Sequence, residues 1–208
     1  MWAACQTNVR FEAAAPMAGP YDLTGVTLDN LLKPTAQPAT YAARLYLIAF
    51  IGYSASRLFG IDLKDYFTPS FASYIPVVFE QELTDLARIK KLAAKGVQVG
   101  AIGSVKKALS GRFRRVVKDR DLSDPLMALL DKEDLWDSVV TCRTLFVCLY
   151  PDELVPWGNT YRTVSNLWRV GLQKEYVNYL VIRDKLNHVT AAAPSIALAR
   201  RYFLGKGN

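Results

Sequence analysis

The sequence predicts an all-α protein of about seven or eight helices with an extended N-terminal arm. Apolar residues recur at three- and four-residue steps in several segments, which is the spacing of one face of a helix. Alternating strand patterns are scarce, and the chain shows no repeat of fixed period. Hydrophobic residues make up 51% of the 208 residues and aromatic residues 12%. That composition supports a full-sized core and excludes a wholly disordered chain.

Residues 1–40 are the first of three predicted regions and form the arm. They show no sustained periodicity, and they contain four of the ten prolines: Pro16, Pro20, Pro34 and Pro38. Aromatic residues such as Trp2, Phe11 and Tyr21 make the arm too apolar for free solution. We therefore expect it to lie against its own domain or against a neighbouring chain.

The second predicted region is one apolar helix over residues 41–61. Its 21 residues would span roughly 31 Å, close to the thickness of a hydrocarbon layer. However, only 12 uncharged residues separate Arg44 from Arg57, a length more typical of a core or interfacial helix. The sequence leaves open whether this helix lies in a soluble core, in a membrane or at a membrane interface. A stripe of small residues along it predicts close helix–helix packing: Gly52, Ser56 and Gly60.

The third predicted region is a helical domain over residues 62–208. Periodicity predicts these helices within it: 77–95, 104–118, 133–150, 159–170, 173–187 and 194–204. The segment 133–150 is apolar nearly all round, which predicts a helix at the centre of the core. We interpret the three cysteines, Cys5, Cys142 and Cys148, as small buried hydrophobes of a reducing compartment.

Positive charge is concentrated in residues 88–120, which carry a net charge of +10, whereas the rest of the chain sums to −3. Such a stretch can contact lipid headgroups, RNA phosphates or an acidic protein. The acidic stretch 119–137 could instead fold back and neutralise it. A single interleaved aromatic, Phe113, argues against a base-stacking platform. The residues predicted to contact anions are Lys106, Lys107, Arg112, Arg114, Arg115 and Lys118.

The same sequence argues against catalysis, so we expect no catalytic, cofactor-binding or metal-ligating residue. His188 is the only histidine, and it lies where a helix dipole would favour a cation. Every Ser–His–Asp or Cys–His scheme depends on it, and no Gly-x-Ser-x-Gly motif is present. Carboxylate pairs such as Asp152 and Glu153 are interpreted as charged helix starts. A hydrolase that uses carboxylates alone is the enzyme alternative left open.

These features predict a non-catalytic accessory subunit of a large multiprotein assembly. The favoured assembly is a membrane-bound organellar complex of the respiratory or ATP synthase type. In it, residues 41–61 would lie in or on the mitochondrial inner membrane. The basic residues would contact partner subunits or an anionic lipid such as cardiolipin. The alternative is a viral capsid or nucleoprotein subunit that binds the RNA backbone through the same residues.

Overall fold

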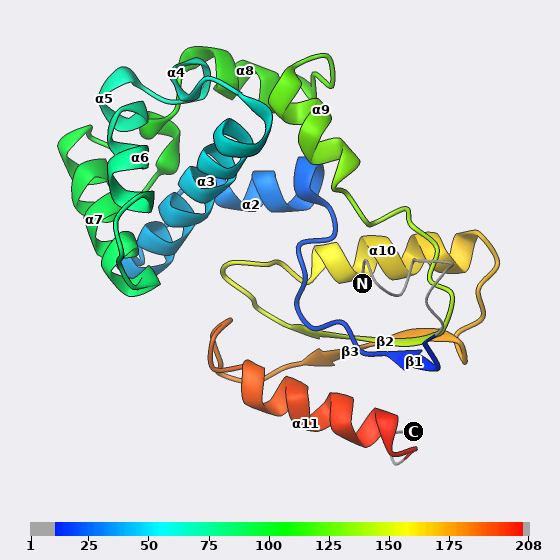
Figure 1. Ribbon diagram of the computed structural model, residues 1–208. Coiled ribbons are helices and arrows are strands. Elements are labelled where there is room, and N and C mark those ends of the chain that lie inside the picture. Colours follow the sequence, from blue (N-terminus) through cyan, green and yellow to red (C-terminus); the bar gives the residue numbers. More distant parts are fainter. Residues whose placement is uncertain (1–10, 206–208) are drawn as a thin grey trace. The chain divides into compact units, whose positions relative to one another are not determined.

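The computed structural model describes residues 11–205, and these form two compact units (Figure 1). The sheet unit comprises residues up to Thr27 together with those from Glu133 onward, and the helical unit comprises Leu28–Lys132. The boundaries expected after residues 40 and 61 both lie inside the helical unit. The first ten residues of the expected arm, with Cys5, lie outside the described residues.

The sheet unit is built on three parallel strands in the order β1 (Ala13–Ala14), β2 (Arg143–Leu149) and β3 (Val177–Ile182). Strands β2 and β3 pair from Thr144 opposite Val177 to Leu149 opposite Ile182. Helices α10 (Gly158–Arg169) and α11 (Ala192–Phe203) cover opposite faces of this sheet (Figure 1). A parallel sheet covered on both faces is the arrangement of α/β proteins.

The core of the sheet unit lies between β2, β3 and α10. Phe146 from β2, Val177 from β3 and Leu167 from α10 are each 0% exposed. The ring of Tyr21, which follows β1, meets the Phe146 ring edge-on, with 5.3 Å between the ring centres. This packing fixes the strands whose ends carry the site described below.

The all-α prediction is wrong, and the class is α/β. The segments 133–150 and 173–187, predicted to be helices, contain β2 and β3 instead. Strand β2 is buried at five of its seven positions, so its apolar run shows no alternation. Such a run cannot be distinguished from a buried helix by periodicity alone. The helices predicted over 159–170 and 194–204 correspond to α10 and α11.

The helical unit consists of one long helix, α3 (Pro38–Phe59), and eight shorter helical elements. Its other elements are α2 (Leu28–Leu31), α4 (Leu63–Tyr66), α5 (Pro69–Ala72), α6 (Tyr74–Phe79), α7 (Asp85–Gln98), η2 (Val105–Ala108), α8 (Gly111–Asp119) and α9 (Pro125–Lys132). Helix α3 packs along α7 and buries Leu45, Ile48 and Ala49 almost completely. In the sheet unit, η1 (Leu23–Thr27) follows Tyr21.

Helix α3 is the apolar helix expected over residues 41–61. Across residues 11–205, no helix combines the length and the hydropathy that crossing a bilayer requires. The small residues of α3 have different structural roles. Gly52 is buried, and a Cβ there would collide with the ring of Phe67, whereas Gly60 ends the helix with a φ of 69°. Ser56 accepts the capping hydrogen bond from the Gly60 N–H through its carbonyl, at 3.0 Å.

Candidate active site

Two polar side chains come together at the carboxyl ends of β2 and β3. Because the two strands are parallel neighbours, the loops that follow them leave from the same edge of the sheet. Asp152 stands three residues after the end of β2, and His188 stands six residues after the end of β3. A backbone hydrogen bond of 2.9 Å from the Tyr150 N–H to the Ile182 carbonyl extends the pairing toward both loops.

The Asp152 carboxylate is fully buried and uses both of its oxygens. Oδ1 accepts the backbone N–H groups of Leu154 at 2.9 Å and Val155 at 2.8 Å, which closes the loop around the carboxylate. Oδ2 lies 2.8 Å from Nδ1 of His188. The Asp152 side chain is 0% exposed and that of His188 29% exposed. The acid is therefore held inside the protein while the imidazole reaches the surface.

Further contacts fix the backbone around His188. Its N–H donates to both carboxylate oxygens of Glu153, each at 3.2 Å. On either side, Asn187 and Thr190 bind each other reciprocally, since each side-chain oxygen accepts the other residue's backbone N–H. This is the geometry of a capping box at the turn that leads into α11. Consecutive residues Asp152 and Glu153 thus orient the ring and the backbone of the same histidine.

The electrostatics of the pair favour a protonated Nδ1. A hydrogen bond to Asp152 raises the pKa of His188 above its ordinary value of 6.5, and the negative charges of Asp152 and Glu153 act in the same direction, while burial opposes them. In the neutral ring, the proton on Nδ1 is donated to the carboxylate. Nε2 then carries a lone pair, and no hydrogen bond joins it to another described residue. An imidazole in this state can accept a proton at Nε2.

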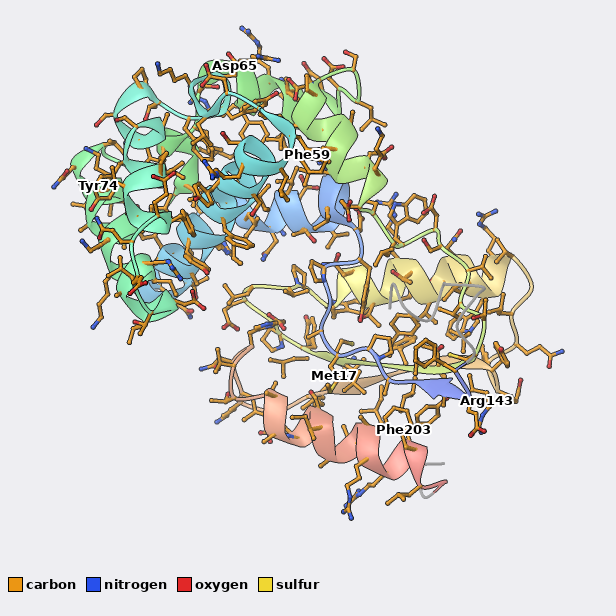
Figure 2. The ribbon with its side chains drawn as sticks, in the orientation of Figure 1. Met17, Phe59, Asp65, Tyr74, Arg143 and Phe203 are labelled. Atoms are coloured by element: carbon orange, nitrogen blue, oxygen red, sulfur yellow. The ribbon has the colours of Figure 1, made fainter. Side chains whose placement is uncertain are left out.

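A cavity of about 220 Å³ adjoins His188. Its lining is largely apolar and comes from the segment after β1, from the end of β2 and from the start of α11: Met17, Ala18, Leu149, Ala191, Ala192, Ser195 and Ile196. Ala18 has a φ of 41°, a left-handed conformation that L-residues other than glycine adopt at a cost, and its N–H binds the Val147 carbonyl at 2.8 Å. Met17, which is 43% exposed, is labelled in Figure 2. Ser195 shares this cavity, yet no hydrogen bond joins its Oγ to His188.

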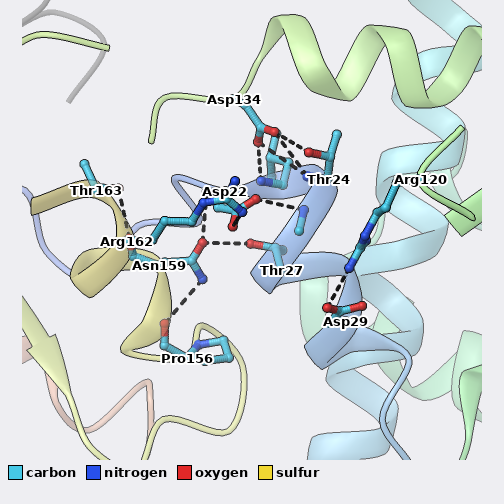
Figure 3. A network of polar contacts seen from close by, with 12 residues as sticks. Asp22, Thr24, Thr27, Asp29, Arg120, Asp134, Pro156, Asn159, Arg162 and Thr163 are labelled. Carbon is cyan, nitrogen blue, oxygen red and sulfur yellow. Dashed lines mark hydrogen bonds and ion pairs between the residues drawn. The ribbon is translucent and has the colours of Figure 1, made fainter. Parts of the chain in front are cut away.

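A buried polar network holds the segment after β1 in place within the sheet unit (Figure 3). Asp22 is 0% exposed, pairs with Arg162 at 2.5 Å, and receives the Gly25 N–H at 2.8 Å. Asn159 accepts the Asp22 N–H at 2.9 Å. The Asp134 carboxylate binds the N–H of Leu23 and the hydroxyl of Thr24. Because every carboxylate oxygen here has a structural partner, the network orients η1 against α10.

The residues predicted to contact anions all lie in the helical unit, on η2 and α8. The structure places these six basic residues in different surroundings. Arg112 forms ion pairs with Asp65 at 2.8 Å and Asp124 at 2.7 Å, so it is engaged within the fold. Arg115 lines a hollow that also contains Asp119 and Asp121. Lys107 is exposed, and the remaining three residues line one groove: Lys106, Arg114 and Lys118.

Sequence reasoning missed the pair formed by Asp152 and His188. His188 was expected to have a structural role at a helix end, and Asp152 was expected to start a helix. Each in fact follows a strand, and recognising the strands was the missing step. The usable signal is an acid after one strand and a histidine after the next, because parallel neighbouring strands bring the loops that follow them to the same edge of a sheet. Cys142 and Cys148 are buried, as expected, and burial raises the pKa of Cys148 to about 11.

Comparison with known proteins identifies the fold. A protein from Legionella pneumophila named as a hydrolase superposes with a TM-score of 0.75 at 16% identity, over 96% of this chain and 49% of its own. The rice cell wall degrading esterase LipA from Xanthomonas oryzae superposes with a TM-score of 0.68 at 16% identity, over 94% and 51%. No family model and no curated protein sequence matches. The chain thus spans about half the length of the structures that share its fold.

These similarities overturn three expectations. Proteins that share this fold include a hydrolase and an esterase, so the expectations of a non-catalytic subunit of a membrane complex and of a capsid subunit are wrong. The expectation that the chain is no enzyme is wrong for the same reason. The expected partner subunits and the expected location at the mitochondrial inner membrane stay predictions.

Proposed function

We propose that the sheet unit supplies the acid and the base of a hydrolase that cleaves an ester bond. The observation that carries this proposal is the 2.8 Å hydrogen bond between the buried Asp152 carboxylate and Nδ1 of His188. It lies at the carboxyl ends of adjacent parallel strands, where ligands bind in open α/β sheets. The fold shared with a hydrolase and with an esterase supports it.

Each residue has a defined role in the proposed reaction. A hydroxyl oxygen attacks the ester carbonyl carbon while Nε2 of His188 takes the hydroxyl proton. The resulting imidazolium is stabilised by the Asp152 carboxylate, which stays ionised. When the bond to the alcohol oxygen breaks, Nε2 returns the proton to that oxygen. Water then attacks the acyl group by the same steps and restores the hydroxyl.

In the proposed reaction, the attacking hydroxyl comes from outside the described residues. In α/β hydrolases the order along the chain is nucleophile, acid and histidine, so the nucleophile belongs before Asp152. Ser195 follows His188 and lies within α11, and its hydroxyl makes no hydrogen bond to the ring. The proposal assigns the nucleophile to a further segment, either of the same polypeptide or of a companion chain.

The first test uses an activated ester, p-nitrophenyl acetate, with which water can serve as the nucleophile. Replacing the base by His188→Gln should lower the rate of hydrolysis by roughly a hundredfold, because a positioned general base contributes about that much. Asp152→Asn should also lower it, because the amide no longer holds the imidazole in the required tautomer. Release of p-nitrophenolate measures both rates.

Glu175→Gln is the matched control, since Glu175 is an exposed carboxylate of the same unit and belongs to no part of the site. It should leave the rate unchanged. Ser195→Ala should leave it unchanged as well. If His188→Gln hydrolyses the ester as fast as the unaltered chain while circular dichroism shows an intact fold, the proposed role of His188 is wrong.

A further inference from the structure

The helical unit has a groove of about 490 Å³ whose polar lining is almost entirely basic. We call it the basic groove. Its charged residues come from α2 and the turn after it, from η2 and from α8 with its cap: Asp29, Lys33, Lys106, Arg114, Lys118 and Arg120. All six belong to one compact unit, so the groove does not depend on how the two units are placed.

Most of this positive charge is not neutralised within the described chain. Asp29 pairs with Arg120 at 2.6 Å. No carboxylate of residues 11–205 forms an ion pair with the other four basic side chains. None of the carboxylates of the acidic stretch 119–137 lines the basic groove, and Asp124 pairs with Arg112 instead. The groove therefore keeps four uncompensated cations.

Two features of α8 are unfavourable for folding alone. Arg114 and Lys118 are four residues apart, so two like charges lie on the same face of the helix, which is destabilising. Arg120 caps the helix with a φ of 53°, in the left-handed region where glycine is strongly preferred. Both unfavourable features place a basic side chain at the same groove. Strain and repulsion that converge on one place indicate a binding role.

The remaining lining defines the size and type of ligand. Leu32 and Val117 are buried and, with Pro34, give the groove an apolar part. Its volume lies within the range of small-molecule pockets, which is about 300–1,000 Å³. No aromatic ring lines it, although binding of a single-stranded nucleic acid relies on stacking of bases on such rings. Lysine ammonium groups act as point charges that suit phosphate.

We propose that the basic groove binds a phosphate group, which is the chemistry that a soluble phosphorylated molecule and a lipid headgroup share. Lys106, Arg114 and Lys118 would contact the phosphate oxygens, and the apolar part would accept the group attached to it. This assignment is independent of the proposed ester hydrolysis, because it involves no residue of the sheet unit. Of the six residues that the sequence predicts to contact anions, the proposal retains the three that line the basic groove.

The experiment is titration calorimetry on the full chain with inorganic phosphate, glycerol 3-phosphate and vesicles of phosphatidylglycerol, with phosphatidylcholine vesicles as the neutral reference. We expect binding that weakens as salt rises. The variant Arg114→Gln/Lys118→Gln should bind at least roughly tenfold more weakly, since two charged donors are lost. Lys118→Gln alone gives a milder variant should the double variant fail to fold.

The matched control is Lys90→Gln/Lys91→Gln, which removes the same charge from exposed positions on α7. It should leave the affinity within about twofold. Binding of glycerol 3-phosphate would indicate a soluble phosphorylated ligand, and binding of anionic vesicles alone would indicate a lipid headgroup; both support a phosphate site. Equal weakening by the two double variants, tighter and length-dependent binding to poly(U), or no binding of any probe would overturn the proposal.

Discussion

Asp152 shows how one buried carboxylate can orient a histidine. Two backbone N–H groups hold Oδ1, which leaves Oδ2 directed at His188. A carboxylate that is 0% exposed would be unfavourable without these partners. The site could not be located from sequence, because 36 residues separate the two side chains and only the pairing of β2 with β3 brings them together.

The raised pKa of His188 links the pair to stability. A histidine whose pKa is higher in the folded than in the unfolded state stabilises the fold below its unfolded pKa, here near 6.5. That contribution is lost as the pH rises through the folded pKa. We therefore expect the free energy of unfolding of the unaltered chain to exceed that of Asp152→Asn most at about pH 5.5, and by less at about pH 9.

Urea unfolding at a series of pH values measures this difference. Glu175→Gln removes an exposed carboxylate that is not among the groups acting on His188, so it should track the unaltered chain across the series. A difference between the unaltered chain and Asp152→Asn that stays constant over the whole series would show that the carboxylate does not hold the proton on His188.

Helices with an exposed face were predictable from the sequence, whereas buried strands were not. Helices α10 and α11 leave a polar face toward solvent, so their periodicity is visible. Strand β2 lies under two helices and reads as one apolar run, and β3 is short. The small-residue stripe of α3 was visible in the sequence as a pattern. Only the structure shows that Gly52 allows close packing against Phe67, whereas Gly60 caps the helix.

Substitutions along α3 separate these two roles. In Gly52→Ala the new Cβ would press on the ring of Phe67, which is 1% exposed, and would lie 3.3 Å from Leu63. We expect a net loss of about 1–2 kcal/mol, because overpacking outweighs the roughly 1 kcal/mol gained in helix propensity. Gly60→Ala should cost about 1 kcal/mol through its left-handed φ alone, since nothing lies within 4 Å.

Ser56→Ala serves as the neutral control and should change the free energy of unfolding by less than about 0.5 kcal/mol. Urea denaturation of the three variants gives these values. Stabilisation by Gly52→Ala would mean that α3 does not pack on Phe67 as the structure has it.

The chain as a whole is a sheet unit interrupted by a helical unit of residues 28–132. Within the sheet unit, Leu23 and Thr24 on one side of the interruption bind Asp134 on the other, so the chain leaves and re-enters at neighbouring points. Insertions of this kind are tolerated where the two ends meet. The sequence did not mark the junction, because no residue separates η1 from α2 and neither Thr27 nor Leu28 is a glycine or a proline.

Both members of the proposed acid–base pair come from residues 143–188, whereas the basic groove belongs to residues 29–120. The proposed acid–base pair and the proposed phosphate site therefore belong to different units of the chain. In the proposed hydrolysis, Asp152 and His188 are two of the three groups that attack by a hydroxyl nucleophile requires. The chain spans about half the length of the hydrolase and the esterase that share its fold.

Nuclear magnetic resonance of the single imidazole offers the sharpest test, because His188 is the only histidine and its ¹⁵N signals need no assignment against others. The pair predicts a proton on Nδ1 in the neutral ring and a pKa above 6.5. Asp152→Asn should abolish both, and Glu175→Gln should preserve both. A pKa at or below 6.5 in the unaltered chain, or a tautomer unaffected by Asp152→Asn, would contradict the assignment of Asp152 and His188 as acid and base.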